Sequence, residues 1–227
     1  MKVLITQPRN KEHLVKAFID AGADVTARLD KDVKLIIPTV DEELVFFSNS
    51  REWFKDAGIM VAVNNEYVIS ECRDTAEFYR FCRRHGFKTP LTMQADLLAK
   101  PRFGKGSRGQ FRIGRDYIVK EYIDGDEYSI DYYDDGRFLS VIPRLRLNVV
   151  NGEAKEAGIV SDPLLIEEAT RLGKELGLQY HNVMQCFYDG KSVVWIEVNC
   201  RYGGGSWLTF HKFNSPKKLV ELTKERF

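Results

Sequence analysis

The first ninety residues alternate between short apolar runs and segments with helical spacing. Residues 1–6, 33–37 and 59–63 are rich in Val, Ile and Leu, as in strands buried on both faces. Residues 11–21, 41–57 and 74–85 carry apolar side chains at helical spacing, and each segment is followed by glycine. Asp74 or Thr75 is placed to cap the last of these helices. The alternation predicts a small parallel sheet with flanking helices.

After residue 90 the pattern changes to a period of two, which is typical of antiparallel strands. Residues 118–122 and 128–133 predict two strands joined around Asp124-Gly125, and residues 138–142 and 144–149 predict two more before a turn at Asn151-Gly152. Residues 183–188 and 193–198 predict a hairpin around Asp189-Gly190. Helices are expected at 163–176 and 217–224. The fold class is therefore α/β followed by α+β, with units expected at 1–90, 91–131 and 132–227.

Composition narrows the class of protein. The chain has 227 residues, 34 basic against 33 acidic residues, and 44% hydrophobic residues, so it can bury a sizeable core. A net charge of +1 gives no reason to expect a nucleic-acid partner. No apolar run reaches the length of a membrane span, so no membrane partner is expected. The four cysteines show no CxxC spacing, which favours a reducing, cytoplasmic location.

One late strand places three polar side chains on alternate residues. In the run from Trp195 to Arg201, the side chains of Glu197, Asn199 and Arg201 are expected on one face, with Ile196 and Val198 in the core. A carboxylate and an amide oxygen beside a cation would suit Mg²⁺ carrying a polyphosphate. An ordinary exposed polar strand face is the alternative.

A glycine-rich loop follows Lys100-Pro101 and runs from Gly104 through Gly106 and Ser107 to Gly109. No helix opens after it, which argues against a dinucleotide-binding loop, and the Walker and protein-kinase motifs are absent from the sequence. The backbone amides of such a loop can hold phosphate oxygens. A flexible basic surface loop is the alternative.

Two further segments are candidates for ligand contacts. Between residues 119 and 127, a strand and a glycine turn lead to Glu127, whose carboxylate could accept hydrogen bonds from ribose hydroxyls. Taken alone, this segment favours the alternative, a common acidic hairpin without function. Arg144 and Arg146 alternate on one strand and could clamp a substrate carboxylate, or form a solvated basic face. His211, after the triple glycine, is a weaker candidate for the acceptor site.

Four motifs occur in a fixed order: Lys-Pro-x-x-Gly-x-Gly-Ser-x-Gly, Glu-Tyr-Ile-x-Gly-x-Glu, Asn-Val-x-Gln, and Ile-Glu-Val-Asn-x-Arg-x-Gly-Gly-Gly. Together they resemble the ATP-grasp superfamily, in particular its carbamoyl-phosphate-synthase-like, carboxylate–amine ligase branch. The resemblance implies a compact ATP-grasp fold of antiparallel sheets with flanking helices after a small α/β domain. It also implies ATP and Mg²⁺ (or Mn²⁺) as cofactors, and a small carboxylic acid and an amine as substrates.

The resemblance implies a role for each matching residue. The residues expected at the nucleotide are Lys100, Gly104, Gly106, Ser107, Gly109, Lys120, Glu121, Ile123 and Glu127. Gln185, Glu197 and Asn199 would hold the metal, and Arg201, with Arg144 and Arg146, would face the reacting groups. A strict two-residue turn at Asp189-Gly190 would place Gln185 opposite Val194, so this metal set requires a longer loop or a diagonal contact.

The chain also departs from the family pattern. Lys120 stands where the family usually has Gln or Glu, and a lysine ammonium cannot accept a hydrogen bond from adenine. Thr75 stands where a basic residue is usual, and the segment between Gly109 and Tyr117 lacks a helix. Two hypotheses follow. In the first, the chain is an ATP-dependent ligase; in the second, it is a non-catalytic nucleotide-binding protein. A homodimer or a partner subunit of a larger synthetase is the expected assembly.

Overall fold

A computed structural model describes residues 1–9, 11–93, 95–103, 108–150 and 153–227. Its first part is a parallel sheet of β1 (Lys2–Ile5), β2 (Asp24–Thr26), β3 (Val33–Ile37) and β4 (Met60–Val61) in the order β2-β1-β3-β4. The predicted parallel sheet is confirmed, although the sequence pattern missed β2, which has only three residues and no buried side chain.

Among the described residues, the helices that accompany this sheet are α1 (Glu12–Asp20), α2 (Asp41–Asn49), α3 (Arg51–Asp56), α4 (Glu66–Arg73) and α5 (Thr75–Arg84). The single helix expected over residues 41–57 is wrong, because the chain breaks at Ser50 into α2 and α3. The helix α4 was not expected. The start of α5 is confirmed, since the Asp74 side chain accepts hydrogen bonds from the backbone N–H groups of Ala76 and Glu77.

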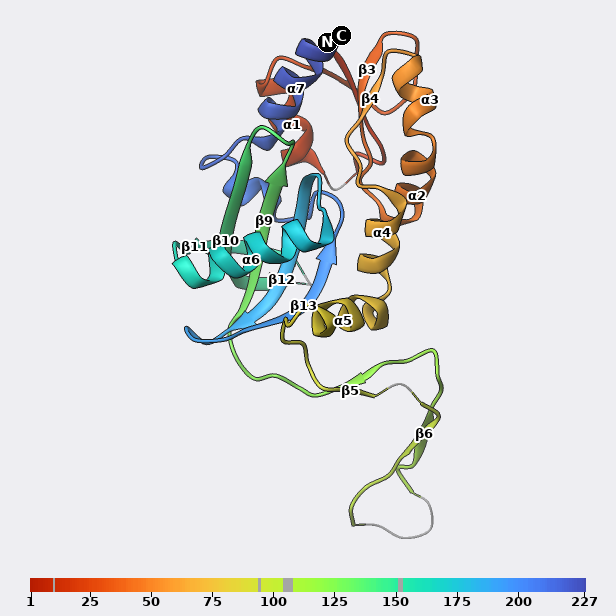
Figure 1. Ribbon diagram of the computed structural model, residues 1–227, viewed down its shortest axis with the longest axis vertical. Coiled ribbons are helices and arrows are strands. Elements are labelled where there is room, and N and C mark those ends of the chain that lie inside the picture. The colour runs from red at the N-terminus through yellow and green to blue at the C-terminus, as the bar shows by residue number, and fades with distance from the viewer. Residues whose placement is uncertain (10, 94, 104–107, 151–152) are drawn as a thin grey trace.

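The second part of the chain is built on a five-stranded antiparallel sheet. Its strands are β9 (Glu127–Asp134), β10 (Leu139–Val150), β11 (Glu153–Ile159), β12 (Tyr180–Tyr188) and β13 (Val193–Asn199), in the order β11-β10-β9-β12-β13. The helix α6 (Pro163–Leu176) crosses one face of this sheet (Figure 1). A short 3₁₀ turn, η1 (Ser206–Thr209), and α7 (Ser215–Arg226) complete the chain.

A narrow extension connects the two parts and projects away from them (Figure 1). In it, β5 (Thr92–Met93) pairs with β8 (Val119–Lys120), and β6 (Leu97–Ala99) pairs with β7 (Phe111–Ile113). The predicted hairpin between residues 118–122 and 128–133 is therefore wrong. The backbone N–H of Glu121 donates to the Leu91 carbonyl, while the Glu121 carboxylate accepts from the Leu91 N–H, so this strand end is tied to the segment before the extension.

The core crosses the expected boundary at residue 90. Buried side chains of α4 and α5, including Phe78 and Tyr79, form one cluster with Ile130, Trp195 and Val198 of the antiparallel sheet. The expected boundary at residue 131 falls within β9, the central strand of that sheet. As a result, the N-terminal ninety residues pack directly against the antiparallel sheet that carries the polar motifs.

The hairpin between β12 and β13 sets the register of the residues predicted to hold a metal, Gln185, Glu197 and Asn199. The connecting loop has four residues, 189–192, and the Asp189 carboxylate accepts hydrogen bonds from the Lys191 and Ser192 N–H groups inside it. A β-bulge then makes Ile196 an extra residue, so that Gln185 pairs with Glu197 and not with Val194.

The same bulge changes which residues of β13 face the core. Trp195 and Val198 are both buried, at 0% and 4% exposed, although a regular strand would point residues three apart to opposite faces. The expectation that Ile196 packs into the core is wrong, since it is only partly buried. Glu197 and Asn199 remain together on the open face of the sheet.

Candidate functional site

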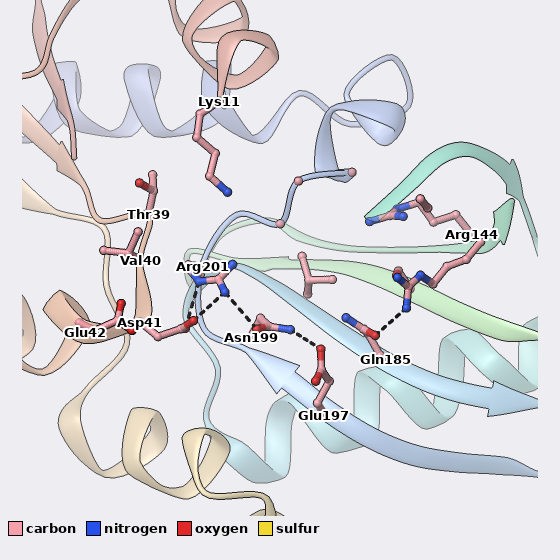
Figure 2. Close-up of a pocket in the computed structure, with 17 residues that line it drawn as sticks. Lys11, Thr39, Val40, Asp41, Glu42, Arg144, Gln185, Glu197, Asn199 and Arg201 are labelled. Atoms are coloured by element: carbon pink, nitrogen blue, oxygen red, sulfur yellow. Dashed lines mark hydrogen bonds and ion pairs between the residues drawn. The ribbon is translucent and has the colours of Figure 1, made fainter. Parts of the chain in front are cut away.

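The polar motifs meet in an open cavity of about 370 Å³ between the sheet and the N-terminal part of the chain (Figure 2). The cavity lies on the face of the sheet opposite α6. Four basic and three acidic side chains line it, together with polar groups and a glycine loop; the lining residues are Lys11, Thr39, Val40, Asp41, Glu42, Ser129, Arg144, Arg146, Ala154, Val183, Gln185, Glu197, Asn199, Arg201 and Gly203, Gly204 and Gly205. Such a wall suits a charged ligand.

Four predicted side chains form a continuous polar row along this wall. Gln185 and Glu197 are register partners on β12 and β13, and the Asn199 amide donates to Glu197 Oε1 over 2.8 Å. The Arg201 guanidinium donates to Asn199 Oδ1 over 3.4 Å. The row therefore presents one carboxylate and two amide groups beside a fixed cation, as Figure 2 shows.

Arg201 is held by an ion pair from the other end of the chain. Its Nε and Nη2 atoms donate to the two carboxylate oxygens of Asp41 over 3.0 and 2.6 Å. Asp41 opens α2, where a negative charge is favoured by the helix dipole. The first turn of α2 is anchored in turn by Glu43, whose carboxylate accepts hydrogen bonds from Thr6 and from the Thr39 N–H. The N-terminal part therefore sets the direction of the Arg201 side chain.

Arg144 and Arg146 both line the cavity, in agreement with their alternate spacing on β10. Arg146 donates to Gln185 Oε1 over 3.0 Å and pairs with the Glu127 carboxylate. The Arg144 side chain is 3% exposed and its Nε donates to Asp131 over 2.9 Å. A solvated basic face does not describe these two residues, because Arg144 is buried, Arg146 is partly buried, and both belong to polar networks.

A family model described as ATP-grasp in the biosynthetic pathway with Ter operon matches residues 114–226, a segment that contains most of this cavity wall. The antiparallel sheet, its helices and the preceding parallel sheet are found in many solved structures of the same fold. The chain belongs to the ATP-grasp superfamily. Among curated proteins, no sequence matches it.

Three solved structures illustrate the ATP-grasp fold. L-amino acid ligase from Bacillus licheniformis is 14% identical, with a TM-score of 0.65, over 100% of this chain and 75% of that one. D-alanine–D-alanine ligase from Bacillus anthracis, complexed with ATP, is 12% identical, with a TM-score of 0.64, over 99% of each chain. Biotin carboxylase from Campylobacter jejuni is 12% identical, with a TM-score of 0.67, over 98% of this chain and 70% of that one. At these identities the likeness establishes the fold.

The nucleotide residues predicted from the ATP-grasp motifs lie mostly apart from the cavity. Lys100, Gly109, Lys120, Glu121 and Ile123 belong to the extension or its base and do not line the cavity. The predicted phosphate contacts Gly104, Gly106 and Ser107 lie outside the described residues. Glu127 is the exception: as the first residue of β9, it reaches the cavity wall through its ion pair with Arg146.

The cavity of this ATP-grasp chain also contains residues that the motifs did not single out. Lys11 and Asp41 come from the starts of α1 and α2, and Thr39 follows the end of β3. The sequence could have indicated these residues, because they follow predicted parallel strands and ligands of parallel sheets bind beyond the carboxyl ends of the strands. His211, considered for the acceptor site, is exposed and does not line the cavity.

Proposed function

We propose that this ATP-grasp chain is an ATP- and Mg²⁺-dependent ligase that activates a small carboxylic acid as an acyl phosphate for attack by an amine. The register of Gln185 with Glu197 is the observation that carries the proposal, because it places the donor row beside Arg144 and Arg201 in one cavity. A carboxylate oxygen of the acid would attack the terminal phosphorus and release ADP. The amine would then attack the acyl carbon, lose a proton and release phosphate.

The donor row fits a magnesium ion. Glu197 supplies one carboxylate, and Gln185 and Asn199 supply amide oxygens, which are hard ligands that leave coordination positions for phosphate and water. Mn²⁺ suits the same ligands. When bound, the ion would neutralise charge on the phosphate oxygens. Among the described residues, no cluster of three or more His, Cys, Asp and Glu side chains offers a rival metal site.

The cations of the cavity have separate tasks in this proposal. Phosphoryl transfer needs positioning and charge neutralisation more than a covalent nucleophile. Arg201, fixed by Asp41, would hold the transferred phosphoryl group. Arg144 lines the same cavity, beside Gly205, and would hold the acid whose carboxylate becomes phosphorylated. The extension that carries Lys100 would approach this cavity with the nucleotide.

Release of ADP tests the proposal directly. The protein is incubated with ATP, Mg²⁺ and pooled carboxylic acids and amines, and hydroxylamine is added to convert an acyl phosphate into a stable hydroxamate. Glu197→Ala should lower ADP release roughly 100-fold, since a lost electrostatic contact to the transition state costs that much. Glu167→Ala is the matched control, because Glu167 is an exposed carboxylate on α6, across the sheet from the cavity.

A second candidate is a nucleotide-binding protein without catalysis. The observation that favours it is the ion pair of Arg146 with Glu127, which occupies the carboxylate expected at the ribose. In that case ATP analogues would still bind, Glu197→Ala and the unmodified protein would give the same background release of ADP, and no hydroxamate would form. That result would end the ligase proposal.

A further inference from the structure

A buried polar cluster lies directly behind the Arg144 wall of the cavity. Asp131 on β9, Arg144 on β10 and His181 on β12 form its centre, at 4%, 2% and 6% exposed. Four more buried residues from the C-terminal segment surround them: Tyr202, Ser206, Thr209 and Ser215. Charged groups are seldom buried to this extent unless they are paired and fully hydrogen-bonded.

The Asp131 carboxylate satisfies both conditions. Its Oδ2 accepts from Arg144 Nε over 2.9 Å and from Thr209 Oγ1 over 3.1 Å, and its Oδ1 lies 3.2 Å from His181 Nε2. Burial alone would raise the pKa of Asp131, but the charge of Arg144 and the hydrogen bond from His181 outweigh it and hold the pKa below its ordinary value. Asp131 is therefore charged and neutralises Arg144.

The hydrogen bonds of His181 follow from the charge on Asp131. A carboxylate only accepts, so His181 Nε2 carries a proton and donates it to Asp131. Nδ1 lies 3.0 Å from Ser215 Oγ, which in turn lies 3.1 Å from the Tyr202 hydroxyl. The imidazole also stacks on the Tyr202 ring, with centroids 4.0 Å apart.

The same histidine reaches the glycine loop of the cavity. His181 Nε2 lies 3.1 Å from Ser206 Oγ, and that oxygen accepts a hydrogen bond of 3.0 Å from the Gly203 N–H. At Gly205, an added Cβ would lie 3.1 Å from Arg144 Nη1, 3.2 Å from Nη2 and 3.3 Å from Cζ. The guanidinium therefore packs against the backbone of the loop that the histidine holds.

The geometry points to Asp131 and His181 as positioning residues for Arg144. Nε–H is committed to Asp131, and within the described part of the chain the two terminal amino groups of Arg144 donate no hydrogen bond. Fixed between Asp131 and Gly205, those amino groups offer a preorganised fork to one planar oxyanion. Under the proposed function, on which this inference rests, that oxyanion is the carboxylate of the acid substrate.

Two measurements test the inference. The first needs no enzymatic activity and measures the hydrogen-exchange rate of the Arg144 Nε–H by NMR in ¹⁵N-arginine-labelled protein. The resonance is assigned by its loss in Arg144→Gln. Asp131→Asn should speed that exchange at least 10-fold. Thr223→Val, which removes a buried hydroxyl bonded to Leu219 O on α7, controls for a general loss of stability and should leave the exchange rate unchanged.

The second measurement is a double-mutant cycle on ADP release at varied acid concentration. Asp131→Asn should raise the KM for the acid roughly 10-fold while the KM for ATP stays constant. In the Arg144→Gln background the same change should have less than a 2-fold effect, because Asp131 acts through Arg144. His181→Gln, which keeps a donor at the ring position, should lie between Asp131→Asn and the unmodified protein.

The outcomes separate the inference from the proposed function. Unchanged Nε–H exchange in Asp131→Asn, or effects of Asp131 and Arg144 that simply multiply, would overturn the positioning role. If the unmodified protein releases no ADP while the exchange rates differ as expected, the ligase proposal fails and the positioning of Arg144 stands.

Discussion

Substitution of Gly173 by alanine should destabilise the protein, although alanine favours helices. Gly173 lies inside α6, against the sheet. A Cβ at this position would lie 2.5 Å from Tyr132 Cζ and 2.9 Å from Cδ2, whereas carbon atoms in contact are about 3.5–4.0 Å apart. Tyr132 is 0% exposed, so its ring cannot turn away without displacing the core.

The expected magnitude is the difference between two effects. Overpacking a tight core costs about 1–3 kcal/mol, and replacing glycine by alanine in a helix gains up to about 1 kcal/mol. Gly173→Ala should therefore lower the free energy of unfolding by up to about 2 kcal/mol. Urea denaturation followed by circular dichroism at the helix band measures this change.

A second substitution isolates the cause. In a Tyr132→Leu background the ring is gone, and Gly173→Ala should become neutral or stabilising by up to about 1 kcal/mol. If Gly173→Ala stabilises the protein that still carries Tyr132, then α6 can move away from the sheet without a cost in free energy. The short distance between Gly173 and the Tyr132 ring would then not limit stability.

Three further predictions concern buried and paired groups. Tyr79→Phe should raise the free energy of unfolding by about 1 kcal/mol in urea titrations, because the buried Tyr79 hydroxyl has no hydrogen-bond partner among the described residues; a loss of stability would mean that the hydroxyl is satisfied. Asp41→Ala should cut ADP release about 10-fold while changing stability by no more than about 1 kcal/mol, since its pair with Arg201 is partly exposed; equal activity would rule out a role for the pair. The pKa of Asp131 is lowered in the folded protein, so the ionised carboxylate contributes its full stability above the unfolded pKa of about 4 and loses it as the pH falls below that value. The urea midpoint of the Asp131→Asn variant should therefore decline less steeply below pH 4 than that of the unmodified protein. Equal slopes for the two proteins would contradict the lowered pKa of Asp131.

Sequence patterns located the strongly periodic elements well. The expected bounds of α6 are those of the structure, because Asp162 accepts a hydrogen bond from Leu165 N–H at its start and Gly177 adopts φ +71° at its end. The polar face of β13 was also expected, because Glu197 and Asn199 are two residues apart. Local signals of this kind are readable because capping and strand alternation act over a few residues.

Features that depend on distant partners were not readable. The bulge at Ile196 arises from pairing with β12, and it leaves Ile196, which was expected in the core, only partly buried. The contact of Asp41 with Arg201 joins residues 160 positions apart. Short elements such as β2 lack enough residues to show a period. In each case tertiary packing decided the outcome, and the sequence motif could supply only the residue types.

The core shared across residue 90 limits how this site can be moved or divided. Trp195, behind the donor row, packs with Phe78 and Tyr79 of the N-terminal part, so residues 114–226 alone would expose that surface to water. A transplanted or separately expressed C-terminal half would keep Gln185, Glu197 and Arg201 but lose the Lys100 loop and Asp41, which holds Arg201. Preserving the cavity therefore constrains apolar positions of the N-terminal part, such as Phe78 and Tyr79, that do not line it.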